Sequence, residues 1–87
     1  MVKEKLNGVE VDLAVDFMDM TDDRRLLTRV ADARTGFVPR TGIFAVVGDD
    51  DADPRVAKII SVGSDGVVEL LVLAGSVESH RDLLVPG

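Results

Sequence analysis

Residues 56–73 have the sequence VAKIISVGSDGVVELLVL, and this stretch decides the fold class. Two segments rich in β-branched residues, at 56–62 and 67–73, flank the four residues from Gly63 to Gly66. The dipeptide Asp65-Gly66 is preferred in tight hairpin turns, because glycine accepts a positive φ at little cost. The stretch therefore predicts an antiparallel β-hairpin.

Upstream of the hairpin, residues 9–17 (VEVDLAVDF) alternate between two types of position. Every odd position is large and apolar, whereas every even position is acidic or alanine. A period of two is typical of a strand with one buried face and one solvated face. We therefore expect one continuous strand over residues 9–17.

Residues 22–34 fit two interpretations. As a helix, the segment has Thr21 as its N-cap, acidic residues in its first turn and Gly36 just past its end. As a strand, it has alternating positions from Leu26 onward and pairs back on residues 9–17 as a hairpin. We favour the strand, because it gives the long first strand an immediate neighbour. The alternative is an α+β fold with one helix at about 22–34.

The rest of the chain adds a buried strand at 43–48 and a polar loop at 49–54 that ends in proline. Residues 74–87 predict a short turn followed by a last strand or a tail. Several short strands in 87 residues predict a mainly β fold, either a small SH3-like barrel or a curled antiparallel sheet of five to six strands. We assign residues 1–87 to a single domain whose ordered core covers about 8–74.

Composition and charge argue against several classes of protein. The chain has 10 Lys and Arg against 16 Asp and Glu, a net charge of −6, and no Cys. Without Cys there is no disulfide scaffold, Cys-based metal site or thiol nucleophile. The acidic balance repels phosphate, which argues against nucleic acid and anionic membranes as partners.

The hydropathy pattern points to a cytoplasmic protein. The lysines near the N-terminus are not followed by the apolar region of a signal peptide. The longest uninterrupted apolar stretches have five residues, whereas a membrane span needs about 20.

The stretch from Gly42 to Asp49, the Asp-rich loop after it, residues 56–60 and the Asp65-Gly66 turn resemble the central strands of small SH3-like β-barrels. The resemblance covers about half of the chain and implies a fold, not a catalytic motif. The Val-, Asp- and Arg-rich composition also resembles that of proteins from high-GC bacteria such as actinobacteria. SH3 domains bind polyproline helices in an aromatic-lined groove. This chain has no Trp or Tyr, so we do not expect a proline-rich ligand.

The Asp-rich loop suggests a divalent-metal site. Asp49, Asp51 and Asp53 have the D-x-D-x-D spacing that opens an EF-hand calcium loop. The sixth position of that motif needs glycine and is Pro54, and the twelfth needs glutamate and is Ile60. We therefore exclude an EF-hand and keep the three aspartates as weak metal candidates beside a simpler interpretation, a solvated turn.

Two other groups of side chains have structural interpretations. Glu10, Asp12 and Asp16 would form the solubilising face of the first strand. The arginines between residues 24 and 40 would pair with Asp22, Asp23 and Asp32 on the surface.

His80 is the only histidine and lies beside Ser79 and Asp82. Neither a nucleophile elbow nor further nitrogen or sulfur metal ligands accompany it, so we interpret it as a surface residue.

No nucleophile, base and oxyanion donor group together in the sequence, so we assign no catalytic residue and expect no cofactor. We predict a non-enzymatic accessory or interaction module with a protein partner, and self-association through an edge strand as a variant. Small-ligand or metal binding by residues 49–53 is the alternative, and a small enzyme subunit is the third possibility. The candidate interface residues are Phe37, Val38, Pro39, Asp50 and Asp51; the first three would either plug the barrel or contact the partner.

Overall fold

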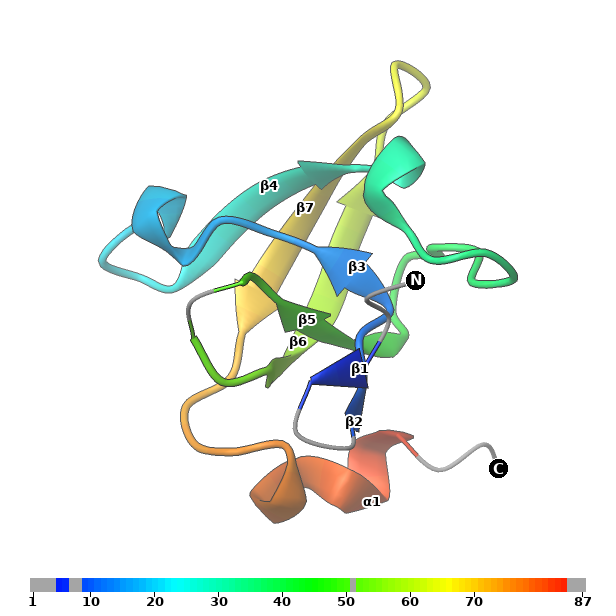
Figure 1. Cartoon of the computed structure of the whole chain (residues 1–87). Helices are drawn as coiled ribbons and strands as arrows, with labels where there is room; N and C mark the ends of the chain where they lie inside the picture. Colours follow the sequence, from blue (N-terminus) through cyan, green and yellow to red (C-terminus); the bar gives the residue numbers. More distant parts are fainter. Residues whose placement is uncertain (1–4, 7–8, 51, 85–87) are drawn as a thin grey trace.

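A computed structural model describes residues 5–6, 9–50 and 52–84 (Figure 1). Within these residues the chain forms seven strands, three short 3-10 helices and one short α-helix. The strands are β1 (Lys5–Leu6), β2 (Val9–Glu10), β3 (Leu13–Ala14), β4 (Arg25–Arg29), β5 (Phe44–Gly48), β6 (Arg55–Val62) and β7 (Val67–Val72). The helices are η1 (Phe17–Asp19), η2 (Val30–Asp32), η3 (Glu78–His80) and α1 (Arg81–Leu84).

The hairpin predicted from residues 56–73 is present as β6 and β7. Its turn places Gly66 at φ 85°, a conformation that L side chains rarely adopt. The Asp65 carboxylate accepts a hydrogen bond from the main-chain N–H of Val67 at 3.1 Å. The turn residues therefore act as the sequence predicts, and the hairpin forms the centre of the sheet.

Five strands form one sheet in the order β3-β5-β6-β7-β4, and the sheet curls into a half-barrel (Figure 1). This arrangement confirms the predicted mainly β fold with a single curled sheet. The sheet is mixed rather than antiparallel, because β3 runs parallel to β5 with Leu13 opposite Val47. β1 and β2 form a separate two-stranded sheet.

Residues 22–34 contain a strand, so the helical alternative is wrong. β4 alternates between exposed and buried positions, with Leu26 and Thr28 facing inward. The expected hairpin with the first strand is also wrong, because β4 pairs antiparallel with β7, with Leu26 opposite Leu70. The five-residue strand ends in η2, so the preference for a strand holds for 25–29 only.

The long strand predicted over residues 9–17 is interrupted. It divides into β2, β3 and η1, with a bend at Asp12. The Asp12 carboxylate accepts hydrogen bonds from the Val46 main-chain N–H at 3.0 Å and from Arg34 Nε at 2.9 Å. These two distant partners bend the chain at Asp12, and the strict alternation of residue types could not reveal them.

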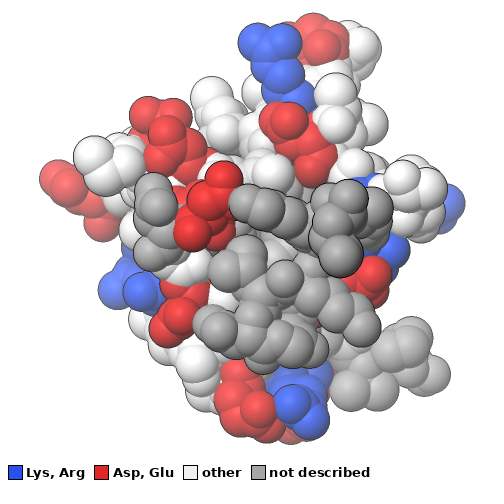
Figure 2. Space-filling model, in the orientation of Figure 1, with Lys and Arg blue, Asp and Glu red and all other residues white. Residues whose placement is uncertain are grey.

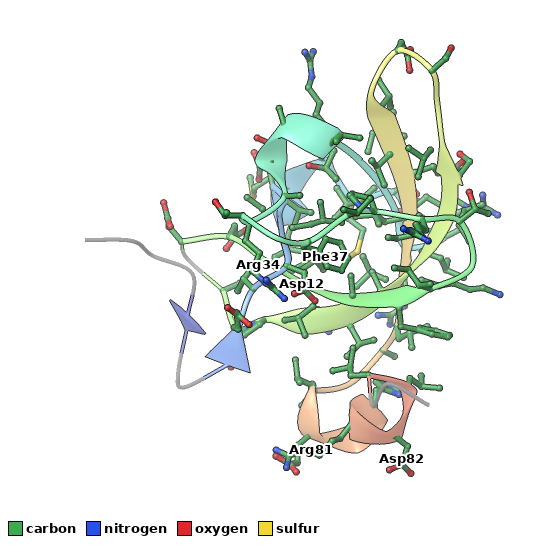
Figure 3. The ribbon with its side chains drawn as sticks, turned by 90° about the vertical axis from the view of Figure 1, so that its right-hand side faces the viewer. Asp12, Arg34, Phe37, Arg81 and Asp82 are labelled. Atoms are coloured by element: carbon green, nitrogen blue, oxygen red, sulfur yellow. The ribbon has the colours of Figure 1, made fainter. Side chains whose placement is uncertain are left out.

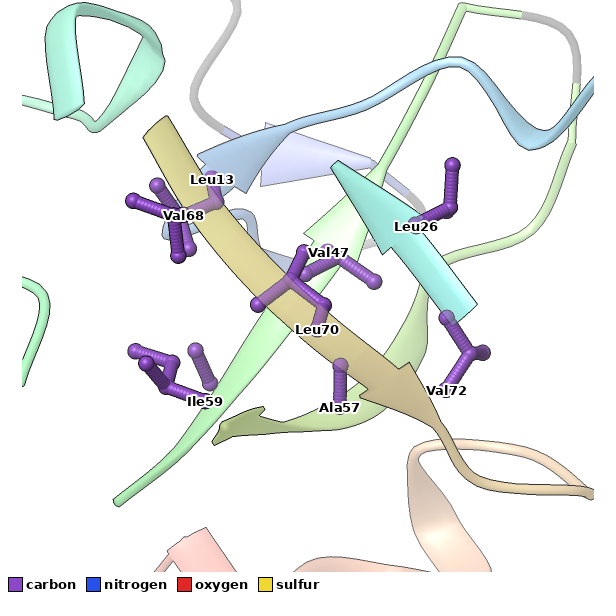
Figure 4. Packing of buried hydrophobic residues seen from close by; sticks show 9 residues of the cluster. Leu13, Leu26, Val47, Ala57, Ile59, Val68, Leu70 and Val72 are labelled. Carbon is purple, nitrogen blue, oxygen red and sulfur yellow. The ribbon is translucent and has the colours of Figure 1, made fainter. Parts of the chain in front are cut away.

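The core lies between the walls of the half-barrel (Figure 4). Its nine clustered residues come from five strands and are aliphatic: Leu13, Leu26, Ala45, Val47, Ala57, Ile59, Val68, Leu70 and Val72. Branched side chains pack well on a pleated surface, which agrees with a chain containing fifteen Val and only three Phe.

The C-terminal part of the described chain does not form the last strand that was one of our expectations. Residues 78–84 form η3 and α1, which lie below the sheet in Figure 1, and α1 contacts β5. Val85 of the expected tail lies outside the described residues.

Candidate functional site

The half-barrel has two edge strands, β3 and β4, and one side chain connects them. Thr28 Oγ1 of β4 donates a hydrogen bond to the Ala14 carbonyl oxygen of β3 at 2.7 Å. The Asp32 carboxylate also lies within 3.2 Å of the same hydroxyl. Thr28 is buried, and the alternating pattern of β4 turns its side chain inward. The two edges therefore approach each other at this point without forming a ladder.

The hydrogen bonds between β4 and β7 show which main-chain groups of β4 point away from β7, toward the open edge. Val72 N–H donates to the Arg24 carbonyl oxygen, and Val30 N–H donates to the Gly66 carbonyl oxygen, both at 2.8 Å. These bonds fix the phase of the antiparallel ladder, in which hydrogen-bonded and non-hydrogen-bonded pairs alternate.

This phase determines where the main chain of each β4 residue points. Leu26 and Thr28 exchange hydrogen bonds with β7, whereas Arg25, Leu27 and Arg29 direct their N–H and C=O groups away from it. Arg25 uses both groups locally, because Thr21 N–H donates to its carbonyl oxygen and Thr21 Oγ1 accepts from its N–H. No main-chain hydrogen bond toward this edge is found for Leu27 within residues 5–6, 9–50 and 52–84, whereas Arg29 is the N-cap of η2.

A groove follows the open edge of β4. It consists of two hollows of about 460 and 430 Å³ that share Asp19 and Leu27. We call it the β4 groove. The first hollow is lined by Ala14, Val15, Asp16, Asp19, Leu27, Thr28, Arg29, Asp32 and Val67, and the second by Asp19, Thr21, Arg25, Leu26, Leu27 and Glu69.

The β4 groove combines negative charge with exposed apolar side chains. The first hollow contains three aspartates and one arginine. Leu27 is 65% exposed, and the neighbouring helices η1 and η2 present Met18 at 90% and Val30 at 40%. Figure 2 shows acidic side chains over much of this face, including its left side, where Figure 1 places η1 and one end of β4.

Charged hydrogen bonds hold the Arg25 end of the groove. Arg25 Nη1 donates to Glu69 Oε2 at 2.7 Å, and this hydrogen bond raises the pKa of the guanidinium. The Thr21 hydroxyl donates to the Asp23 carboxylate, which lowers the pKa of that carboxyl. The structure thus confirms the predicted pairing of an arginine with Asp23.

The Asp-rich loop is organised around Asp49. Its carboxylate accepts from the main-chain N–H groups of Phe17 at 3.3 Å and Ala52 at 2.8 Å. These bonds tie the loop to η1 and form the type of turn expected for aspartate. Asp51 lies outside the described residues. Among the described residues, no three acidic or histidine side chains are grouped as metal ligands.

The Phe37-Val38-Pro39 segment divides its side chains between core and surface. Phe37 packs against the core cluster and Pro39 is buried, whereas Val38 is 62% exposed. The expectation of a plug under the barrel holds for Phe37 and Pro39. Among the interface candidates described, Val38 and Asp50 are the exposed ones.

The expected acidic outer face of the first strand is wrong for Asp12. The carboxylate of Asp12 is only 15% exposed and pairs with Arg34, whose guanidinium also lies 5.8 Å from the centre of the Phe37 ring (Figure 3). Glu10 adds a longer ion pair to Arg34 at 3.6 Å. This cluster joins three segments of the chain, and its function is structural.

His80 is a half-buried residue whose ring Nε2 lies 2.6 Å from the Ala74 carbonyl oxygen. The neighbouring Ser79 hydroxyl donates to the Ser76 carbonyl oxygen at 2.8 Å. Because both side chains contact main chain, the described geometry does not assemble a triad of Ser79, His80 and Asp82.

Family models, curated proteins and solved structures were compared with the chain, and none matches it. No helix among the described residues is long and apolar enough to cross a membrane. The β4 groove is the feature of the described chain best suited to binding a partner. Sequence reasoning missed this groove, although the exposed leucine of an alternating strand, Leu27, is the signal that could have identified it.

Proposed function

We propose that the chain is a small, non-enzymatic, cytoplasmic interaction module that binds a partner protein through the β4 groove. One observation carries the proposal: Leu27 offers unpaired main-chain groups beside an exposed apolar side chain. Edge strands with such groups are templates for pairing with another chain, and proteins usually cover or blunt them. A binding partner is a natural cover for this edge.

The other surfaces considered have less support. Phe37 and Pro39 pack inward, whereas Val38 and Asp50 are exposed but do not line the β4 groove. A metal or small ligand at residues 49–53 would compete with the main-chain hydrogen bonds that Asp49 already accepts. The half-barrel agrees with the resemblance to SH3-like barrels, but without Trp or Tyr we do not propose a proline-rich ligand.

Affinity capture from the native cell tests the proposal. The tagged chain is compared with Leu27→Asp, and with Val38→Asp as a matched control at an equally exposed valine. We expect the chain and Val38→Asp to retain the same partner in near-equal amounts, and Leu27→Asp to lose at least four-fifths of it. The absence of any partner above a tag-only control, or equal retention by Leu27→Asp, would overturn the proposal. Thermal melts verify that both variants remain folded, since both positions are largely exposed.

A further inference from the structure

We infer that the β4 groove takes an extended partner segment with a basic–apolar–basic pattern, added as a strand along Leu27–Arg29. The inference rests on the proposed function and specifies the chemistry of the partner. It follows from three properties of the described groove: the open main chain, the position of its carboxylates and the exposed side chain of Leu27.

The main chain sets the position and length of the added strand. A residue paired with Leu27 can exchange two hydrogen bonds with it, as in any antiparallel ladder. At one end of the edge, Thr21 already forms hydrogen bonds with the main-chain N–H and carbonyl of Arg25. At the other end, β4 passes into η2 after Arg29. The added segment therefore spans about three to five residues, each of which advances the strand by about 3.3 Å.

An acidic side chain, Asp32, lies on the inner side of the edge. Thr28 faces inward and contacts both Ala14 and Asp32, so the wall that contains them lies on the Thr28 side of β4. Asp16 and Asp19 line the same hollow. Side chains of the added strand that point to this side would meet the Asp32 carboxylate and the hollow that Asp16 and Asp19 also line, and lysine or arginine is the complementary choice.

The apolar side chain lies on the other side. Leu27 alternates with its neighbours Leu26 and Thr28 and points outward. The residue of the added strand opposite Leu27 therefore lies on the outer face, where an apolar side chain would cover part of Leu27. Its two neighbours point inward to the carboxylates, which gives the pattern basic–apolar–basic.

A second copy of the chain is a poorer occupant. Antiparallel pairing of β4 with itself, centred on Leu27, places Arg25 of each copy opposite Arg29 of the other. Like charges directly opposite each other destabilise a sheet. In such a dimer, Arg25 of each copy would repel Arg29 of the other. A basic–apolar–basic segment directs its charged side chains inward and so places none opposite these arginines on the outer face.

Fluorescence anisotropy with a fluorescein-labelled peptide Lys-Val-Lys-Val-Lys tests the inference on the full chain at low salt. The controls are Glu-Val-Glu-Val-Glu and the lysine peptide with N-methyl groups on both valines, which removes hydrogen-bond donors. We expect saturable binding of the lysine peptide, binding at least tenfold weaker after N-methylation, and none of the glutamate peptide.

Charge reversal on the protein gives the matched comparison. Asp19→Lys changes a carboxylate shared by both hollows, and Asp82→Lys makes the same change on α1, well away from the groove (Figures 1 and 3). We expect at least fivefold weaker binding for Asp19→Lys and less than twofold for Asp82→Lys. Equal binding of the lysine and glutamate peptides, or equal effects of the two variants, would overturn the inference.

The failure of this inference differs from failure of the proposed function. If capture depends on Leu27 but the lysine peptide does not bind, the function stands and the basic–apolar–basic segment is wrong. If light scattering shows a dimer that Leu27→Asp dissociates, the occupant is a second copy and the inference is also overturned.

Discussion

Thr28 Oγ1 donates to the Ala14 carbonyl oxygen at 2.7 Å, and this bond joins the two edge strands of the half-barrel. The hydroxyl is also within 3.2 Å of Asp32, so one buried side chain connects β4, β3 and η2. The bond also places the acidic wall next to the open part of β4. The shape of the groove therefore depends on Thr28.

Thr28→Val keeps the shape of this side chain and removes its hydroxyl. We expect a loss of about 1–3 kcal/mol in unfolding free energy, because the Ala14 carbonyl oxygen loses its buried donor. Urea denaturation measures the loss. Thr28→Ser keeps the hydroxyl but removes a buried methyl group, and it should remain more stable than Thr28→Val. Equal stability of the two variants would show that the methyl group, and not the hydrogen bond, matters.

The Asp12–Arg34 pair should show strong coupling. A double-mutant cycle with Asp12→Ala and Arg34→Ala is expected to give about 1–2 kcal/mol of interaction, since both side chains are partly buried at 15% and 25% exposure. The exposed pair Arg81–Glu78 serves as the control and should give less than about 0.5 kcal/mol. Similar coupling in the two cycles would contradict the structural role given to Asp12.

Arg24 is the only described residue other than glycine with a positive φ, at 67°. Arg24→Gly should raise the unfolding free energy by about 0.5–1 kcal/mol, because glycine avoids the left-handed strain. The same substitution in Arg29, at φ −129°, should lower stability by about 0.5–1 kcal/mol. Thermal denaturation distinguishes the two signs, and a destabilised Arg24→Gly would refute the argument.

Stability should respond to the titration of Asp23. Its pKa is lowered in the folded chain, mainly by the hydrogen bond from Thr21, so its ionised form favours folding. That contribution is present above the usual carboxyl pKa of about 4 and is lost as the pH falls through the lowered value. Urea titrations at pH 7 and pH 2.5 should show Asp23→Asn less stable than the original chain only at the higher pH. A difference that does not change with pH would be inconsistent with this assignment.

Local sequence chemistry predicted the parts of the fold that depend on neighbouring residues. Asp65 and Gly66 specify the turn of the β6–β7 hairpin, and alternation identified β4 at Leu26 and Thr28. The bend at Asp12 was not predictable, because it depends on Val46 and Arg34, which are 34 and 22 residues away.

The β4 groove was not predictable for a related reason. It lies between the edge β4 and the chain from Ala14 to Thr21, and neither wall by itself has a binding motif. Only the curvature of the sheet brings Asp16 and Asp32 to the same hollow.

Amide hydrogen exchange of Leu27, followed by NMR with and without the Lys-Val-Lys-Val-Lys peptide, tests the central claim most directly. In the free chain, we expect the Leu27 amide to exchange at least a hundredfold faster than those of Leu26 and Thr28, which bond to β7. Saturation with the peptide should slow Leu27 selectively by at least tenfold. A Leu27 amide already as protected as its neighbours in the free chain, or one unaffected by the bound peptide, would contradict an open β4 edge that accepts a strand.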